Sequence, residues 1–245
     1  MPAEVQALDL TSLEAEQAQL EEQVAFSELE RETTKTDLTR FQKRYYDMVG
    51  RLYVELDKLL SSISEKVAAA NPHDIAAQNE AIAAQERARI SAEEAGLLEA
   101  QPDPPAEISA ECKKSYRKAA MLMHPDRATS DSERVRRTQM MVKINLAYER
   151  GDRASIEKLM IEFGEDPEAI TGVDAASRAK KATLRIAQLC RRLEEIEQEL
   201  DALRQAEIFH LMTRVEEAEA LGDSPLSELA AQLLKEISKC RQMRQ

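Results

Sequence analysis

The sequence predicts an all-α protein in which two long coiled-coil helices flank a compact helical middle. Glycine is scarce, with 6 in 245 residues, tryptophan is absent, and charged residues make up 33% of the chain. This composition is typical of long helices rather than sheets. Apolar residues also recur at steps of three and four in two separate stretches, which is the spacing of a coiled-coil seam.

The first predicted domain, residues 1–70, is an N-terminal coiled-coil helix that spans about 8–68. Leu13, Leu20 and Val24 begin its apolar stripe. The stripe is clearest further on, where it consists of Leu38, Phe41, Tyr45, Met48, Leu52, Leu56, Leu59 and Ile63. Gly50 is the one weak point, because glycine inside a helix costs about 1 kcal/mol relative to alanine.

An alanine-rich helix is predicted over residues 71–100, beginning near Pro72. Asn71 can cap this helix, and Asp74 suits its first turn. Its apolar stripe is thin and has to pack on a neighbour; it consists of Ile75, Ile82, Ile90 and Leu97.

The C-terminal part is also predicted to contain a long coiled-coil helix and a shorter one. Residues 173–222 are predicted to form a coiled-coil helix from about Ala175 to Leu221, and residues 225–245 a terminal helix. The seam of the long helix is regular: Ile186, Leu189, Leu193, Ile196, Leu200 and Leu203. The two long helices could pair with each other as an antiparallel coiled coil, or with a second copy in a homodimer, and the sequence does not choose between these arrangements.

The middle domain, residues 101–167, follows a stiff proline-rich linker at 101–105. A helix over 106–123 has one apolar face, formed by Ile108, Cys112, Tyr116, Ala119 and Met123. Its basic residues lie away from that face. Pro125 ends the helix, and further helices are expected over about 132–150 and up to Phe163. The two longer helices can form an antiparallel hairpin, with His124-Pro125-Asp126 exposed at its tip.

Two stretches of the middle domain resemble a J-domain. KKSYRKAAMLMHPDR, residues 113–127, looks like helix II and the HPD loop, and INLAYERGD, residues 144–152, looks like the end of helix III. The resemblance covers about residues 95–165, so the fold implied is a J-domain hairpin inserted between long coiled-coil helices. The family's opening Asp-Tyr-Tyr-x-x-Leu-Gly motif is absent, and Gly96-Leu97-Leu98-Glu99 is the candidate substitute for helix I. Gly/Phe-rich and zinc-binding segments are also absent.

The resemblance implies a co-chaperone that is not itself an enzyme. J-domains dock their basic helix II on an acidic surface of a DnaK-type heat-shock chaperone, and the HPD loop triggers ATP hydrolysis by that chaperone. Ala120 would lie near the contact. The chaperone-binding residues implied by position are Lys113, Lys114, Tyr116, Arg117, Lys118, Met121, His124, Pro125, Asp126 and Arg127. No cofactor or metal is implied, and the coiled coils would recruit or position a protein target of unknown identity.

Two other functions compete with this hypothesis. The chain could be a coiled-coil scaffold whose J-like hairpin no longer engages a chaperone. Nucleic-acid binding through the basic helix is disfavoured, because the net charge is −12 and residues 106–165 carry only 12 basic against 10 acidic side chains.

The sequence also argues against several other classes of protein. None of the six glycines precedes a lysine, so no GxxxxGK phosphate-binding loop is present. No apolar run approaches the roughly 20 residues that span a membrane, and the N-terminus lacks an apolar signal core. Cys112, Cys190 and Cys240 form no CxxC pair. We therefore expect a cytoplasmic protein.

Overall fold

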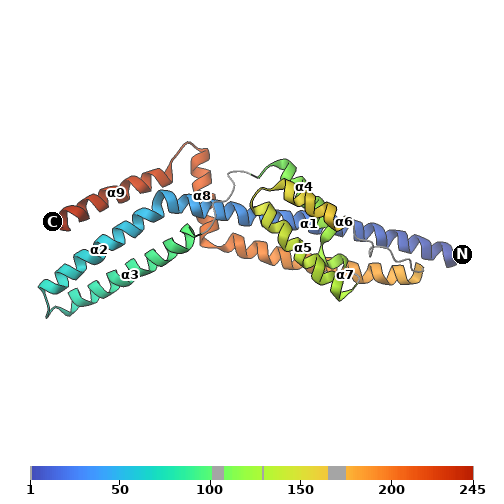
Figure 1. Ribbon diagram of the computed structural model, residues 1–245, viewed down its shortest axis with the longest axis horizontal. Coiled ribbons are helices and arrows are strands. Elements are labelled where there is room, and N and C mark those ends of the chain that lie inside the picture. The colour runs from blue at the N-terminus through green and yellow to red at the C-terminus, as the bar shows by residue number, and fades with distance from the viewer. Residues whose placement is uncertain (1, 101–107, 129, 165–174, 245) are drawn as a thin grey trace. The chain divides into compact units, whose positions relative to one another are not determined.

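A computed structural model of the chain describes residues 2–100, 108–128, 130–164 and 175–244 (Figure 1). Every regular element within these ranges is a helix, and none of these helices has an apolar stretch long enough to cross a membrane. The expected linker at 101–105 lies outside the described residues. The chain divides into two compact units: unit 1 holds Met1–Asp37 and Pro104–Ala206, and unit 2 holds Leu38–Asp103 and Glu207–Gln245.

A pair of long helices in unit 1 joins the two predicted coiled-coil stretches within one chain. Helix α1 (Pro2–Tyr45) contributes Val24 to a buried cluster, and α7 (Ala175–Gln205) contributes Leu189, Ile196 and Leu200. The apolar seam of α7, which could have paired with a second copy of the chain, is therefore filled by α1 of the same chain.

The register of the pair is fixed by three ion pairs at steps of seven residues: Glu14–Arg178, Glu21–Arg185 and Glu28–Arg192. Residue numbers rise together on both helices, so α1 and α7 run parallel (Figure 1). The antiparallel alternative is wrong. A parallel pair is possible because a long segment separates the two helices and returns the chain to the same end.

A helical hairpin packs against this pair in unit 1. It consists of α4 (Ala110–Met123), the 3₁₀ turn η2 (Pro125–Arg127) and α5 (Asp131–Glu149), and α6 (Arg153–Gly164) covers its side. The hydroxyl of Tyr116 donates to Asn145 Oδ1 over 3.0 Å, and Arg137 donates to the Leu122 carbonyl over 2.8 Å, which sets α4 and α5 antiparallel. Helix α4 begins at 110, not 106, because the side chain of Ser109 caps it.

Unit 2 contains the second half of the predicted N-terminal helix, with one irregularity. A π-helical turn, η1 (Tyr46–Gly50), separates α1 from α2 (Arg51–Ala70). Gly50 is required there, because a Cβ at this position would lie 2.6 Å from Cδ2 of the buried Tyr46 ring. The glycine that weakens the helix by propensity thus makes room for an aromatic side chain.

Helix α3 (Ile75–Glu99) packs on α2 in a way that differs from the prediction. The thin apolar stripe is exposed, and α3 instead buries Ala84 and Ala95, whose small side chains allow close approach. Asp74 caps α3 by accepting from the backbone of residues 76 and 77, whereas Asn71 ends α2. Residues 96–99 lie in α3 and belong to unit 2, whereas the α4–α5 hairpin belongs to unit 1. Their role as a substitute for helix I of a J-domain stays a prediction.

The predicted single helix from 175 to about 221 is wrong. A bend at Ala206 divides it into α7 and α8 (Glu207–Ala220), and α9 (Pro225–Arg244) follows. The break has a reason in the sequence, because the step of five from Leu203 to Ile208 does not continue a seam built on steps of three and four. In unit 2, α9 packs along α2, with an ion pair between Arg241 and Glu55.

Candidate functional site

The turn between α4 and α5 is built by local hydrogen bonds. The backbone of His124 still donates to the Ala120 carbonyl over 3.0 Å, but its ψ of 135° leaves the helix, as expected for a residue before proline. Pro125 then takes the first position of η2, and Arg127 donates back to the Met121 carbonyl over 2.6 Å. The His-Pro-Asp turn is therefore held in one conformation.

This turn is not exposed, which corrects the prediction from sequence. His124 is only 6% exposed, and Pro125 is half-buried. Helix α1 covers the turn because Ala25 and Leu29 pack into the apolar core of the hairpin. The neighbouring Glu28 then lies with its Oε1 3.4 Å from Nε2 of His124.

Glu28 is the centre of a buried charge network that joins three elements. Its Oε1 accepts two hydrogen bonds from Arg192 of α7, at 2.9 and 2.7 Å, and its Oε2 lies 2.8 Å from Arg31. Burial opposes the charged form of the carboxyl. The hydrogen bond to His124 and the charges of the two arginines outweigh burial, and together they lower the pKa of Glu28 from 4.5 to about 2.

His124 faces carboxyl groups on both sides of its ring. Its Nδ1 lies 3.3 Å from the backbone N of Asp126 and equally 3.3 Å from Asp126 Oδ2. The neutral ring accepts from that N–H, whereas the imidazolium directs a proton at the carboxylate. Burial disfavours the imidazolium, but hydrogen bonds to Asp126 and Glu28 outweigh burial and raise the pKa of His124 above 6.5.

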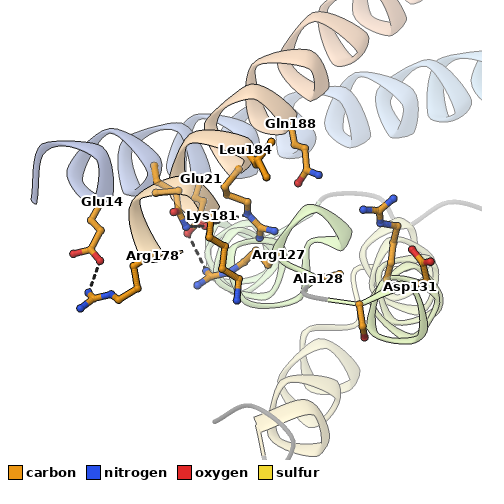
Figure 2. Close-up of a pocket in the computed structure, with 14 residues that line it drawn as sticks. Glu14, Glu21, Arg127, Ala128, Asp131, Arg178, Lys181, Leu184 and Gln188 are labelled. Carbon is orange, nitrogen blue, oxygen red and sulfur yellow. Dashed lines mark hydrogen bonds and ion pairs between the residues drawn. The ribbon is translucent and has the colours of Figure 1, made fainter. Parts of the chain in front are cut away.

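A cavity of about 480 Å³ lies beside the turn, between η2, the start of α5, α1 and α7. Figure 2 shows its charged lining, with Glu14 facing Arg178 and Glu21 next to Arg127. Arg127 lies 3.1 Å from Glu21, which also lies 3.8 Å from Arg185. Burial lowers the pKa of Arg185 to about 10. These ion pairs on the cavity wall connect the end of η2 to α1, and α1 to α7.

The basic residues of α4 divide into a covered and an open group. Lys114 and Lys118 are exposed, and Lys113 is partly exposed. Arg117 instead points at α1, where its guanidinium lies 3.4 Å from Glu22 and stacks 5.8 Å from the centre of the Phe26 ring. The expected single basic face is therefore partly neutralised by α1.

Three further residues predicted at or near the chaperone contact differ in how far they are buried. Tyr116 is completely buried, with its ring centre 4.7 Å from that of Tyr148, so it supports the hairpin from inside and does not reach the surface. Ala120 is buried in the hairpin core, and Met121 is half-buried and packs against that core.

Sequence reasoning missed the acidic partners of the turn. Glu21, Glu22 and Glu28 lie on the long helix for which the sequence predicts only a coiled coil. A signal was present, since glutamates recur at 14, 21 and 28 and arginines at 178, 185 and 192. Matching steps of seven on two coiled-coil stretches indicate paired charged positions.

Two further observations bear on the chemistry of the site. Among the residues that the structure describes, no three His, Cys, Asp or Glu side chains are arranged to hold a metal ion. Comparisons of the chain with protein-family models, curated proteins and solved structures found no match.

Proposed function

We propose that this chain is a J-domain co-chaperone, which stimulates ATP hydrolysis by a DnaK-type heat-shock chaperone through His124, Pro125 and Asp126. The observation that supports the proposal is the position of this triplet. It follows a basic helix directly and forms the turn of an antiparallel helical hairpin. The fold proposed for residues 101–167 is accordingly a J-domain hairpin, and the α1–α7 coiled coil would position a protein target.

The chemistry of the hairpin suits such a partner. Lys114 and Lys118 offer exposed positive charge, which speeds the encounter with an acidic surface. The turn itself is rigid, because Pro125 fixes one backbone angle and Arg127 ties the turn to α4. A preformed turn loses little conformational entropy when it docks.

Single-turnover ATP hydrolysis by a DnaK-type chaperone tests the proposal. We expect the native chain to accelerate hydrolysis and His124→Gln to lose that acceleration. His73→Gln, which changes an exposed histidine between α2 and α3, is the matched control and should behave as the native chain does. If no acceleration depends on His124, either in the native chain or in a variant whose turn has been uncovered, the co-chaperone function is wrong.

A coiled-coil scaffold with a non-functional hairpin is the second candidate, and one observation favours it. The His-Pro-Asp turn is buried in a charge network with two long helices, which is how a structural turn would be held. A scaffold predicts that His124→Gln changes stability but never the chaperone's hydrolysis rate. The oligomeric state, measured by sedimentation, adds a second test. The Leu189–Leu200 seam is filled by α1, so a homodimer through this seam can form only if α1 and α7 separate.

A further inference from the structure

The surface that a chaperone would have to touch is already occupied within unit 1. His124 is buried, and the side chain of Asp126 is only 25% exposed. An external protein cannot reach the His124 ring while α1 remains in place, because Glu28 lies against the ring and Ala25 packs into the hairpin core. Access to the turn therefore requires α1 to move away from the hairpin.

The residues of α1 that cover the turn are acidic, and their partners are basic. Glu28 contacts His124, and Glu22 lies 3.4 Å from Arg117. Glu21 lies 3.1 Å from Arg127. Each of these three partners is a residue to which the proposed function assigns contact with an acidic chaperone surface. Helix α1 thus presents the same chemistry as that surface to the same residues.

Helix α7 holds these acidic residues in position. Arg192 donates two hydrogen bonds to Glu28, and Arg185 lies next to Glu21. Between these two points, Val24 of α1 is buried against Leu189. We call residues 21–28 of α1, which residues 185–192 of α7 hold in place, the acidic cover.

We propose that the acidic cover is an autoinhibitory element, which competes with an acidic protein partner for the His-Pro-Asp turn and must be displaced before that partner can dock. The inference rests on the proposed co-chaperone function. The chain then exists in a closed form and an open form, and only the open form docks. The apparent affinity for the chaperone is reduced in proportion to the fraction of open chains.

The uncovered lysines give the displacement a starting point. Lys114 and Lys118 are exposed in the closed form, so an acidic surface can contact α4 before the cover moves. Arg117, His124 and Arg127 would then exchange one set of carboxylates for another. Such an exchange keeps each cation paired throughout, which avoids leaving a buried charge without a partner.

Variants of Glu28 test the cover without changing the turn. Glu28→Gln keeps the shape of the side chain and removes its charge, whereas Glu28→Lys places a cation against Arg31, Arg192 and His124. Glu16→Lys is the matched control, because Glu16 is exposed on the same helix. Stimulation of single-turnover ATP hydrolysis is measured below saturation. Amide hydrogen exchange of residues 120–128 is measured in parallel to report whether the turn has opened.

The expected result is a graded gain of function. Glu28→Lys should increase stimulation by more than about a hundredfold, because breaking a buried ion pair shifts the opening equilibrium by at least that factor. Glu28→Gln should give a smaller increase, and Glu16→Lys should stay within about twofold of the native chain. Adding His124→Gln to Glu28→Lys should abolish the gain. Exchange in 120–128 should rise in the order native, Glu28→Gln, Glu28→Lys.

Contrary outcomes separate the two proposals. Equal stimulation by the native chain and by Glu28→Lys, with faster exchange in 120–128, would overturn autoinhibition and leave the co-chaperone function intact. Faster exchange without stimulation in any variant would overturn the co-chaperone function, and the autoinhibitory role with it. Unchanged exchange in both Glu28 variants would show that Glu28 does not hold the cover, which also overturns the inference. Because Glu28→Gln is isosteric, it provides a folded variant even if Glu28→Lys unfolds.

Discussion

Removing the charge of Glu28 should weaken the closed arrangement of unit 1 by an amount that its pKa predicts. The pKa of this carboxyl is lowered from 4.5 to about 2 in the folded chain. At about 1.4 kcal/mol for each tenfold change, this lowering corresponds to about 3 kcal/mol of stabilisation near neutral pH. Glu28→Gln is the closest uncharged analogue and should lose most of that energy.

Amide hydrogen exchange can measure this loss locally. An energy of about 3 kcal/mol corresponds to more than about a hundredfold increase in the opening equilibrium of the turn. We expect that increase in residues 120–128, with no change in 51–70 of unit 2 as the internal reference. The way in which the stabilisation by Glu28 changes with pH follows from its lowered pKa. The contribution of Glu28 is complete above about pH 4.5 and is lost as the pH falls towards about 2.

Glu16→Gln provides the baseline for this measurement, because it removes an exposed charge from the same helix. The native chain and Glu28→Gln should become alike at low pH, after correction for the intrinsic pH dependence of exchange. An increase of less than about threefold in Glu28→Gln at neutral pH would refute the reasoning, since it would mean that burial cancels the ion pairs.

Three further predictions concern stability. Gly50→Ala should destabilise unit 2 by about 1–3 kcal/mol, because the new methyl group meets the buried Tyr46 ring. Gly96→Ala is the control: its methyl group has nothing within 4 Å, so it should stabilise α3 by about 0.5–1 kcal/mol, and thermal unfolding compares the stabilities of the two variants. The pKa of His124 is raised in the folded chain, so its stabilisation of the turn is complete below about pH 6.5 and is lost as the pH rises through the folded pKa. Amide hydrogen exchange of the turn, measured from pH 5 to 9, checks this pH dependence, which His124→Gln should abolish. Leu189→Ala should cost about 2–5 kcal/mol in urea unfolding, against less than about 0.5 kcal/mol for Leu184→Ala, whose side chain is 59% exposed; equal costs would contradict the α1–α7 seam.

The sequence was sufficient for features that depend on residues close together in the chain. The helical class, the hairpin and the seam at Leu189, Ile196 and Leu200 all follow from spacings within one helix. The end of α4 at His124 follows from one proline. These features are set by local geometry, so periodicity and capping residues are enough to locate them.

Features that depend on packing between distant segments were not predictable in this way. The parallel direction of α1 and α7 is fixed by charge pairs far apart in the chain, such as Glu28–Arg192. The π-helical turn exists because Tyr46 packs over Gly50, and propensity alone counts that glycine as a defect. The burial of His124 was missed because the resemblance describes a hairpin by itself, whereas here α1 contributes Ala25 to the hairpin core.

The energetics of the acidic cover place a limit on how it can work. If Glu28 supplies about 3 kcal/mol to the closed form, its charge lowers the open fraction more than about a hundredfold relative to Glu28→Gln, and a partner that docks only on open chains binds the native chain correspondingly more weakly. A partner that begins at the exposed Lys114 and Lys118 avoids part of this cost, because it can exchange carboxylates with α1 one pair at a time. The same logic predicts selectivity: an acidic surface can displace the cover, whereas a neutral surface would leave Arg117, His124 and Arg127 without carboxylate partners.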